Sequence, residues 1–508
     1  MKRKFSLKDS VLYRYRYPFA LIVLALFVCT TVFYRLGDLP AGLSPNEAAT
    51  VVSVDQFNPK HIFRLHAPIL PHIAGLPWLS IELVSVQLLG RSVFAWRLPS
   101  ALCAIIAVGL LVRLIWRMRK PALAIIAGFL FGTSATLLGV AHSATPIAFM
   151  MMLLCLSLLL GLTALSDQSR QLTRSAAKLG LCLAMTVLLY LPGGLIIDAS
   201  FLLTALLHPR SRLIIKEHKL AATGWCLVLL LLLAPWVGLL AWDVITGSQA
   251  KLVSQLVWGG GALWHGDTLA TLGSALLGFV PWQGTSIIPA GMLTLVDVVL
   301  LAWGLWVILQ SFSAVRSYCC LILLVALLVY GTFNLAALPL AFLPVTILAV
   351  LGLGDIIDRW YVLFPRNPYA RTFALVPLTV LILSVGWFNV CRYHEALSYD
   401  KATVYSYNDE YQVAFDLTKD KRTLVLVVPD NQLELYLGLH SHRRAVIVAA
   451  SAADQLRKSD FKENAHMVVL GSADFHPDSK QLAERAVVAG WRKDKPILAR
   501  VYYGGSEQ

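Results

Sequence analysis

The fold is decided by a polar interruption between the first two apolar segments, Leu39–Pro99, which reads LPAGLSPNEAATVVSVDQFNPKHIFRLHAPILPHIAGLPWLSIELVSVQLLGRSVFAWRLP. Apolar runs at 19–34 and 98–116 flank it, so it is expected to form a long loop beside a bilayer. A loop of this length between spanning helices is usually functional. Its chemically useful side chains are Glu47, three histidines (His61, His66, His72) and three arginines (Arg64, Arg91, Arg97).

The composition around this loop is that of a membrane protein. Hydrophobic residues make up 57% and charged residues 14% of the 508-residue chain, and the mean hydropathy is +0.68. Soluble proteins have roughly 45–50% apolar and about 25% charged residues. We therefore predict a polytopic α-helical membrane protein. Its net charge of +14 suits cytoplasmic loops and lipid headgroups, and no basic folded module indicates nucleic-acid binding.

The positions of basic residues predict the topology. The N-terminal segment is basic and precedes the run 19–34, so we expect an uncleaved first span with a cytoplasmic N-terminus. About eleven crossings are expected, and an odd number places the C-terminus on the exoplasmic side. The predicted spans are 19–34, 98–116, 122–140, 147–165, two short helices within 179–207, 221–241, 287–309, 319–335, 338–353 and 372–388.

Two domains follow from this pattern. Residues 1–392 are expected to form the membrane domain, with exoplasmic loops at 36–96 and 242–283. Residues 393–508 have ordinary polarity and are expected to form a small exoplasmic α/β domain, serving as a lid or as a platform for a partner. Predicted strands at 423–428, 445–449, 467–470 and 497–502 alternate with predicted helices at 431–439, 452–457 and 479–489, which indicates a parallel sheet.

Glu47 is the first candidate for chemistry. It follows Ser44-Pro45-Asn46, so a turn is expected to lead into a short helix near the membrane surface. Its carboxylate is either a general base for an acceptor hydroxyl, a ligand for a divalent metal, or a first-turn acid that complements the helix N-terminus.

The three arginines of the loop are expected on the outer side, where positive charge is depleted. A lipid-linked phosphate is the anion that Arg64, Arg91 and Arg97 are predicted to bind. The alternative is headgroup contact or pairing with Glu82.

The remaining candidates are possible substrate contacts. The histidines of the loop have spacings of five and six residues, which match no zinc signature, so no metal site is defined. His66 and, in the next exoplasmic turn, His142 are candidates for substrate binding. In the second loop, Trp282 and Gln283 suit either sugar stacking or an interfacial aromatic belt.

Several stretches together resemble a known superfamily. These are HAPILP (66–71), LLGRSVFAWRLPSALCAIIAVGLLVRL (88–114), PWQG (281–284) and ALPLAFLPVTILAVLGLGD (337–355). They resemble the GT-C superfamily of polyprenyl-phosphate-sugar-dependent glycosyltransferases, especially the protein O-mannosyltransferase and aminoarabinose transferase-like families. The resemblance covers roughly residues 19–358.

The resemblance implies an inverting transfer of a sugar from a polyprenyl-phosphate donor, with an acidic first-loop residue as base. The family's Asp-Glu pair falls on Asn46-Glu47, so Glu47 would have to be the base. Arg91 and Arg97 match the arginine region, where donor phosphate is contacted. The acidic residue usual after the third span has no counterpart in AHSATPIAF (141–149), which weakens the case for a metal.

The implied partners are the lipid-linked donor, the bilayer, and an envelope glycan, lipid or protein as acceptor. The implied location is a bacterial inner or plasma membrane. Two alternatives stay open. One is a non-catalytic scaffold built on a degenerate GT-C body. The other is a transporter of lipid-linked glycans, for which only Asp198 and Asp297 stand out as ionisable residues within spans.

Overall fold

The computed structural model describes residues 11–56, 69–166, 171–217, 268–277, 288–364 and 368–400, apart from a few single positions, together with isolated positions between 223 and 234 and parts of 407–503. The chain divides into two compact units. Unit 1 consists of residues 1–34, 65–78 and 100–400, and unit 2 of residues 35–64, 79–99 and 401–508. The predicted domain boundary at residue 392 lies inside a helix.

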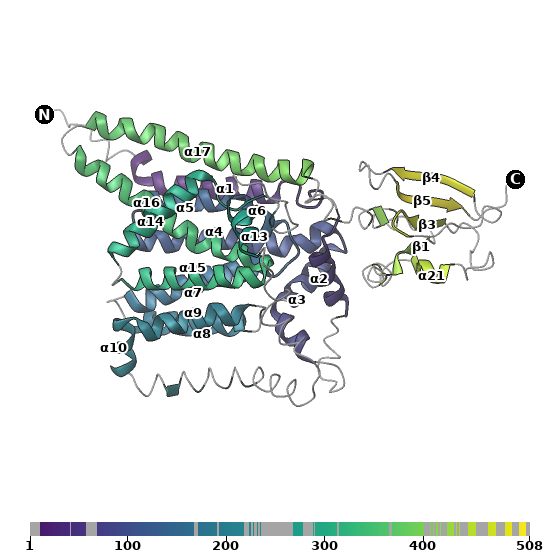
Figure 1. Ribbon diagram of the computed structural model, residues 1–508, viewed down its shortest axis with the longest axis horizontal. Helices are drawn as coiled ribbons and strands as arrows, with labels where there is room; N and C mark the ends of the chain where they lie inside the picture. Colours follow the sequence, from purple (N-terminus) through teal and green to yellow (C-terminus); the bar gives the residue numbers. More distant parts are fainter. Residues whose placement is uncertain are drawn as a thin grey trace. The chain divides into compact units, whose positions relative to one another are not determined.

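Helices dominate the part of the chain before residue 400 (Figure 1). Among the described residues, six stretches are long and apolar enough to cross a membrane: Tyr15–Phe33, Val93–Met118, Ile147–Leu165, Val315–Phe333, Leu335–Leu363 and Leu375–Tyr399. They belong to α1 (Val11–Phe33), α4 (Val93–Met118), α7 (Ile147–Ser166), α15 (Val315–Phe333), η2 (Leu335–Ala341) with α16 (Phe342–Leu363), and α17 (Pro368–Tyr399). The predicted polytopic helical fold is confirmed.

One predicted span is broken, and one predicted helix pair is present. The span 122–140 consists of α5 (Pro121–Gly132) and α6 (Ala135–Ala141), bent by 61°, and Ser134 caps α6 by accepting a hydrogen bond from Leu137 N. The predicted pair of short helices within 179–207 is also present. It consists of α8 (Gln171–Leu189) and α9 (Gly194–Leu207), which pack side by side (Figure 1).

Several predicted boundaries were wrong. The span expected from residue 287 begins later, as α14 (Leu295–Gln310), because Thr294 and Asp297 form a capping box that fixes the helix start. α16 continues to Leu363, beyond the predicted end at 353, and α17 is longer than 372–388 at both ends. The predicted span 221–241 lies almost wholly outside the described residues, so the total of eleven crossings stays a prediction.

Close packing of α14 on α16 depends on glycine. A Cβ added at Gly304 of α14 would lie 2.0 Å from the carbonyl oxygen of Leu348, and one added at Gly352 of α16 would lie 2.6 Å from that of Leu300. The two backbones therefore approach each other at a distance that only glycine permits.

The segment between α1 and α4, which we call the first loop, is mostly helical. The short helix expected after Pro45 is α2 (Pro45–Gln56). The loop also contains a helix that the sequence analysis missed, α3 (Ile69–Leu89). Gly90 follows the end of α3 with a φ of +81°, and Ser92 then caps α4 by accepting a hydrogen bond from Ala95 N. The remaining described helices are α10 (Pro209–Glu217), α13 (Thr268–Leu276) and the short α21 (Ala450–Ala453).

The C-terminal sheet confirms the predicted small α/β domain but corrects its topology. The strands are β1 (Leu424–Val428), β2 (Ala445–Ala449), β3 (His466–Leu470), β4 (Ala483–Ala489) and β5 (Ile497–Tyr503), in the order β2-β1-β3-β5-β4. β2, β1 and β3 are parallel, as expected, whereas β5 is antiparallel to both β3 and β4.

The strand β4 replaces a predicted helix. The segment 479–489, SKQLAERAVVA, is rich in helix formers, which is why a helix was predicted. In the structure residues 483–489 pair with β5 along the edge of the sheet. The backbone hydrogen bonds to a neighbouring strand outweigh a weak local preference.

Candidate functional site

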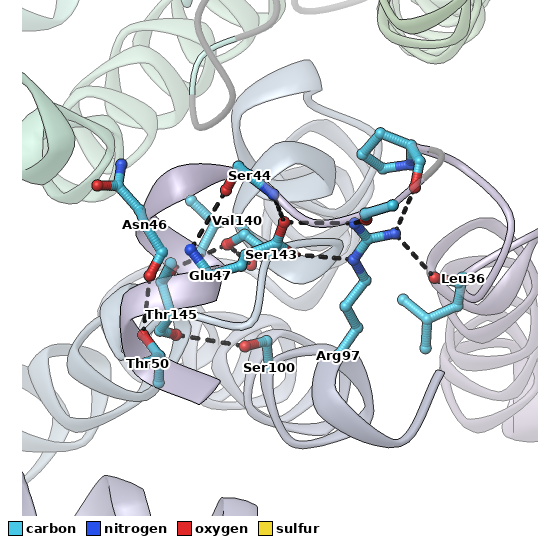
Figure 2. Close-up of polar contacts among 12 residues, drawn as sticks. Leu36, Ser44, Asn46, Glu47, Thr50, Arg97, Ser100, Val140, Ser143 and Thr145 are labelled. Atoms are coloured by element: carbon cyan, nitrogen blue, oxygen red, sulfur yellow. Dashed lines mark hydrogen bonds and ion pairs between the residues drawn. The ribbon is translucent and has the colours of Figure 1, made fainter. Parts of the chain in front are cut away.

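The structure brings two of the predicted site residues together inside unit 2. Glu47 lies in the first turn of α2 and Arg97 near the start of α4, fifty positions apart in the sequence. Their side chains form an ion pair in which Arg97 Nε lies 2.9 Å from Glu47 Oε1, and both side chains are 0% exposed. Figure 2 shows this pair with its surroundings.

The Arg97 guanidinium donates hydrogen bonds in every in-plane direction. Its Nε and Nη2 reach the two carboxylate oxygens of Glu47, at 2.9 and 3.3 Å. The other bonds go to backbone carbonyls: Nη2 to Gly42 O at 2.6 Å, and Nη1 to Pro40 O at 2.7 Å and Leu36 O at 3.5 Å. Five hydrogen bonds match the five N–H groups of arginine, so Arg97 organises residues 36–42 around itself.

The Glu47 carboxylate is also engaged with its own helix. Its Oε2 accepts a hydrogen bond from Ser44 N at 2.8 Å, while the Ser44 hydroxyl accepts one from Glu47 N at 3.3 Å. This reciprocal arrangement is a capping box at the start of α2. The first-turn role that the sequence analysis considered for Glu47 is therefore present, combined with the ion pair.

A fully bonded buried pair stabilises local structure in a specific way. Each charge is compensated by its partner and by backbone groups, whereas removal of one partner alone would leave a buried charge, at a cost of about 3–5 kcal/mol. The pair thus ties together α2, α4 and the chain segment that follows α1.

The neighbouring candidates lie differently. Asn46 is exposed, and its side chain points away from Arg97 (Figure 2). Arg91 is half-buried in the turn between Gly90 and Ser92. His142 belongs to unit 1, where it is buried, contacts Val32 O through Nε2 at 2.8 Å, and packs edge-on against Tyr393. Arg64, His66, Trp282 and Gln283 lie outside the described residues.

Two features of this region were missed by the sequence analysis. The carbonyl oxygens of Leu36, Pro40 and Gly42 are invisible in a side-chain pattern, because any residue can supply them. Tyr407, from the C-terminal part of the chain, lies with its ring centre 6.0 Å from the Arg97 guanidinium carbon and is 5% exposed. An isolated arginine within the apolar run FAWRLP was the only signal for a buried partner.

A metal ligand set is not formed by the described residues. Among them no three histidine, cysteine, aspartate or glutamate side chains gather at a distance that would hold an ion. The described residues around Glu47 therefore do not add to the case for a metal role.

Comparison with known proteins identifies the type of fold. Residues 75–242 match the family model for dolichyl-phosphate-mannose-protein mannosyltransferase. No sequence among the curated proteins matches the chain. The crystal structure of ArnT from Cupriavidus metallidurans in the apo state superposes with a TM-score of 0.53 at 14% identity, covering 96% of this chain and 98% of that one.

The chain has the GT-C membrane glycosyltransferase fold.

A second structure of the same relative, ArnT bound to undecaprenyl phosphate, gives a TM-score of 0.54 at 15% identity, with the same coverage of both chains. The GT-C resemblance predicted from the sequence is confirmed at the level of the fold, and the protein is an integral membrane protein. The family match spans 168 residues (242 − 75 + 1), about a third of the chain, and includes Arg91 and Arg97.

Proposed function

We propose that this GT-C protein transfers a sugar from a polyprenyl-phosphate donor to an acceptor on the exoplasmic face of the membrane. The observation that carries this proposal is the near full-length superposition on ArnT, one structure of which holds undecaprenyl phosphate. The mannosyltransferase family match over residues 75–242 supports the same reaction class.

The protein must perform two functions in this reaction. The donor arrives with a phosphate leaving group, so positive charge must stabilise the phosphate as the bond to the sugar breaks. The acceptor hydroxyl must lose its proton to a base. Arg91, half-buried in the turn before α4, is the described arginine that we assign to the donor phosphate, together with Arg64.

Arg97 and Glu47 fit a positioning role better than direct contact with substrate. All five N–H groups of Arg97 are engaged within the protein, and both oxygens of Glu47 accept hydrogen bonds there. For Glu47 to act as the predicted base, the acceptor would have to reach a carboxylate that is 0% exposed. The pair instead supports the loop on which the substrates would be bound.

A transfer assay tests the proposal. Purified protein in proteoliposomes would be given a panel of radiolabelled undecaprenyl-phosphate sugars with membrane glycans as acceptor, and the release of undecaprenyl phosphate would be measured. We expect the wild type to consume at least one donor. Arg91→Gln should raise the KM for that donor at least tenfold, whereas Lys178→Gln, an exposed residue of α8, should leave it unchanged.

The scaffold alternative is favoured by one observation. The position where the resemblance expects an aspartate is the amide Asn46, which cannot accept a proton at neutral pH. A wild type that consumes no donor, while its deletion still alters the cell envelope by mass spectrometry of glycans, would establish the scaffold. Asp297 does not support the transporter alternative, because its carboxylate caps the N-terminus of α14.

A further inference from the structure

Two arginines at one end of unit 1 carry positive charge that the described carboxylates leave largely uncompensated. We propose that Arg119 and Arg316 form a binding site for the phosphate group of an anionic phospholipid, between the end of α4 and the start of α15. The site is separate from the proposed transfer reaction and concerns a lipid of the surrounding membrane.

Arg316 has no acidic partner among the described residues. It is the second residue of α15, it is half-buried, and no described carboxylate forms an ion pair with it. A cation in the first turn also faces the positive end of the helix dipole, and Ala314, which precedes α15, supplies no side-chain cap. Both features are unfavourable for the protein alone, and an anion beside Arg316 would relieve both.

Arg119 brings a second guanidinium to the same place. It follows Met118, the last residue of α4, and its charge lies close enough to that of Arg316 for the two to repel each other. Its Nε is buried and has no hydrogen-bond partner among the described residues, while Nη1 lies 3.7 Å from Asp358 Oδ2, beyond hydrogen-bond length. Two guanidinium groups that repel each other, one of them with a buried and unused donor, are stabilised by an anion that bridges them.

The two carboxylates at this end of unit 1 serve other cations more closely. Asp358 Oδ1 lies 2.7 Å from Lys120 Nζ, and Asp355 Oδ2 lies 2.6 Å from Arg359 Nε. Together with the two arginines of the proposed site, these side chains carry four positive and two negative charges, so a net charge of +2 (4 − 2) remains. The excess falls on the two arginines, because the other two cations are paired.

The position of the two arginines indicates a lipid phosphate. They lie at the ends of two stretches that are long and apolar enough to span a membrane, Val93–Met118 and Val315–Phe333. Trp116, one turn before Arg119, packs edge-on against Tyr17 with ring centroids 6.2 Å apart, and these two residue types are enriched at the level of the lipid headgroups. This end is the one that the predicted topology places in the cytoplasm, where basic pockets between spanning helices bind the headgroups of anionic lipids.

Lipid titration of the full-length protein in detergent tests the site. Phosphatidylglycerol, zwitterionic phosphatidylcholine or inorganic phosphate is added, native mass spectrometry counts the bound lipid, and thermal unfolding measures the stabilisation. We expect one phosphatidylglycerol to bind at least about fivefold more tightly than phosphatidylcholine, and inorganic phosphate to stabilise the protein far less.

Three variants identify the residues. Arg316→Gln should weaken phosphatidylglycerol binding by about tenfold, because it removes charge-assisted hydrogen bonds to the phosphate. Arg316→Lys keeps the charge but loses the planar fork, so its loss should be smaller. Arg117→Gln is the matched control, since it makes the same change of charge at an exposed residue of α4, and it should change binding less than about twofold.

The inference is overturned by any of three results. Equal weakening by Arg117→Gln and Arg316→Gln would show a general attraction of lipid to a basic surface. No preference for phosphatidylglycerol over phosphatidylcholine would exclude a site for anionic lipid. Stabilisation by inorganic phosphate that equals that by phosphatidylglycerol and is lost in Arg316→Gln would identify a soluble phosphate compound as the ligand. If Arg316→Gln unfolds without lipid, Arg316→Lys replaces it in the same comparison.

Discussion

At the scale of single residues, the feature that matters most is a buried guanidinium with every donor in use. Arg97 would be costly to bury alone, and it is compensated by Glu47 and three backbone carbonyls. The same set of bonds fixes the backbone at Leu36, Pro40 and Gly42. One arginine thereby holds this segment against α2 and α4.

Arg97→Met is expected to destabilise the protein by about 3–5 kcal/mol, because it leaves the Glu47 carboxylate buried without its cation. The double variant Glu47→Gln with Arg97→Met should lose less than the sum of the two single variants, since neither charge then remains. Thermal unfolding in detergent measures both effects. Additive losses would show that the two side chains do not interact.

Ser44→Ala should destabilise the protein by about 1 kcal/mol, because it removes the hydroxyl that accepts from Glu47 N in the capping box of α2. The control is Thr50→Ala in the same helix, whose hydroxyl donates a hydrogen bond to Asn46 O. Equal stability of the Ser44 variant and wild type would mean that the ion pair alone fixes the start of α2.

At the scale of elements, the fold of unit 1 depends on pairs of helices that pack closely and on helix breaks at defined positions. α14 and α16 meet at Gly304 and Gly352, where the partner backbone fills the space of a side chain. Capping at Thr294 and Ser134 sets where α14 and α6 begin. Hydropathy placed most of these helices in the correct part of the sequence, but it did not place their starts.

Gly304→Ala should sharply reduce the yield of folded protein, because its Cβ would lie 2.0 Å from Leu348 O and the two helices would have to separate. Overpacking of this kind costs about 1–3 kcal/mol, or more where backbone must move. Gly109→Ala in α4 is the matched control, since a Cβ there meets nothing within 4 Å. Size-exclusion profiles of the two variants provide the comparison, and similar profiles would contradict the close helix contact.

At the scale of the whole molecule, residues 401–508 belong to the same compact unit as residues 35–64 and 79–99, which include Glu47 and Arg97. Tyr407 lies beside the Arg97 guanidinium, and Glu410, a few residues further on, accepts a hydrogen bond from the Ser472 hydroxyl just after β3. These contacts connect the ion pair to the C-terminal sheet. The lid or platform role predicted for this domain stays a prediction, but its connection to Arg97 is structural.

Tyr407→Ala should destabilise unit 2 by about 3–5 kcal/mol, because it removes a buried aromatic ring together with that ring's contact with the Arg97 guanidinium. Tyr407→Phe keeps the ring and should lose less stability than the alanine variant. Limited proteolysis, with cleavage between residues 35 and 43 as the readout, measures the loosening of the segment whose carbonyls bind Arg97. An unchanged cleavage rate in the alanine variant would show that Arg97 does not depend on the ring.

The sequence by itself determined the membrane class, most of the spans, and the strands β1, β2, β3 and β5, because these follow from hydropathy and periodicity along short windows. It also singled out Glu47 and Arg97 as unusual charges near the first loop. Their pairing, the carbonyls of residues 36, 40 and 42, the strand β4 and the contact of Tyr407 were decided by the tertiary structure alone. The physical reason is that each of these depends on which distant segment becomes a neighbour: a buried charge requires a partner, but nothing in the residues beside it says where along the chain that partner lies.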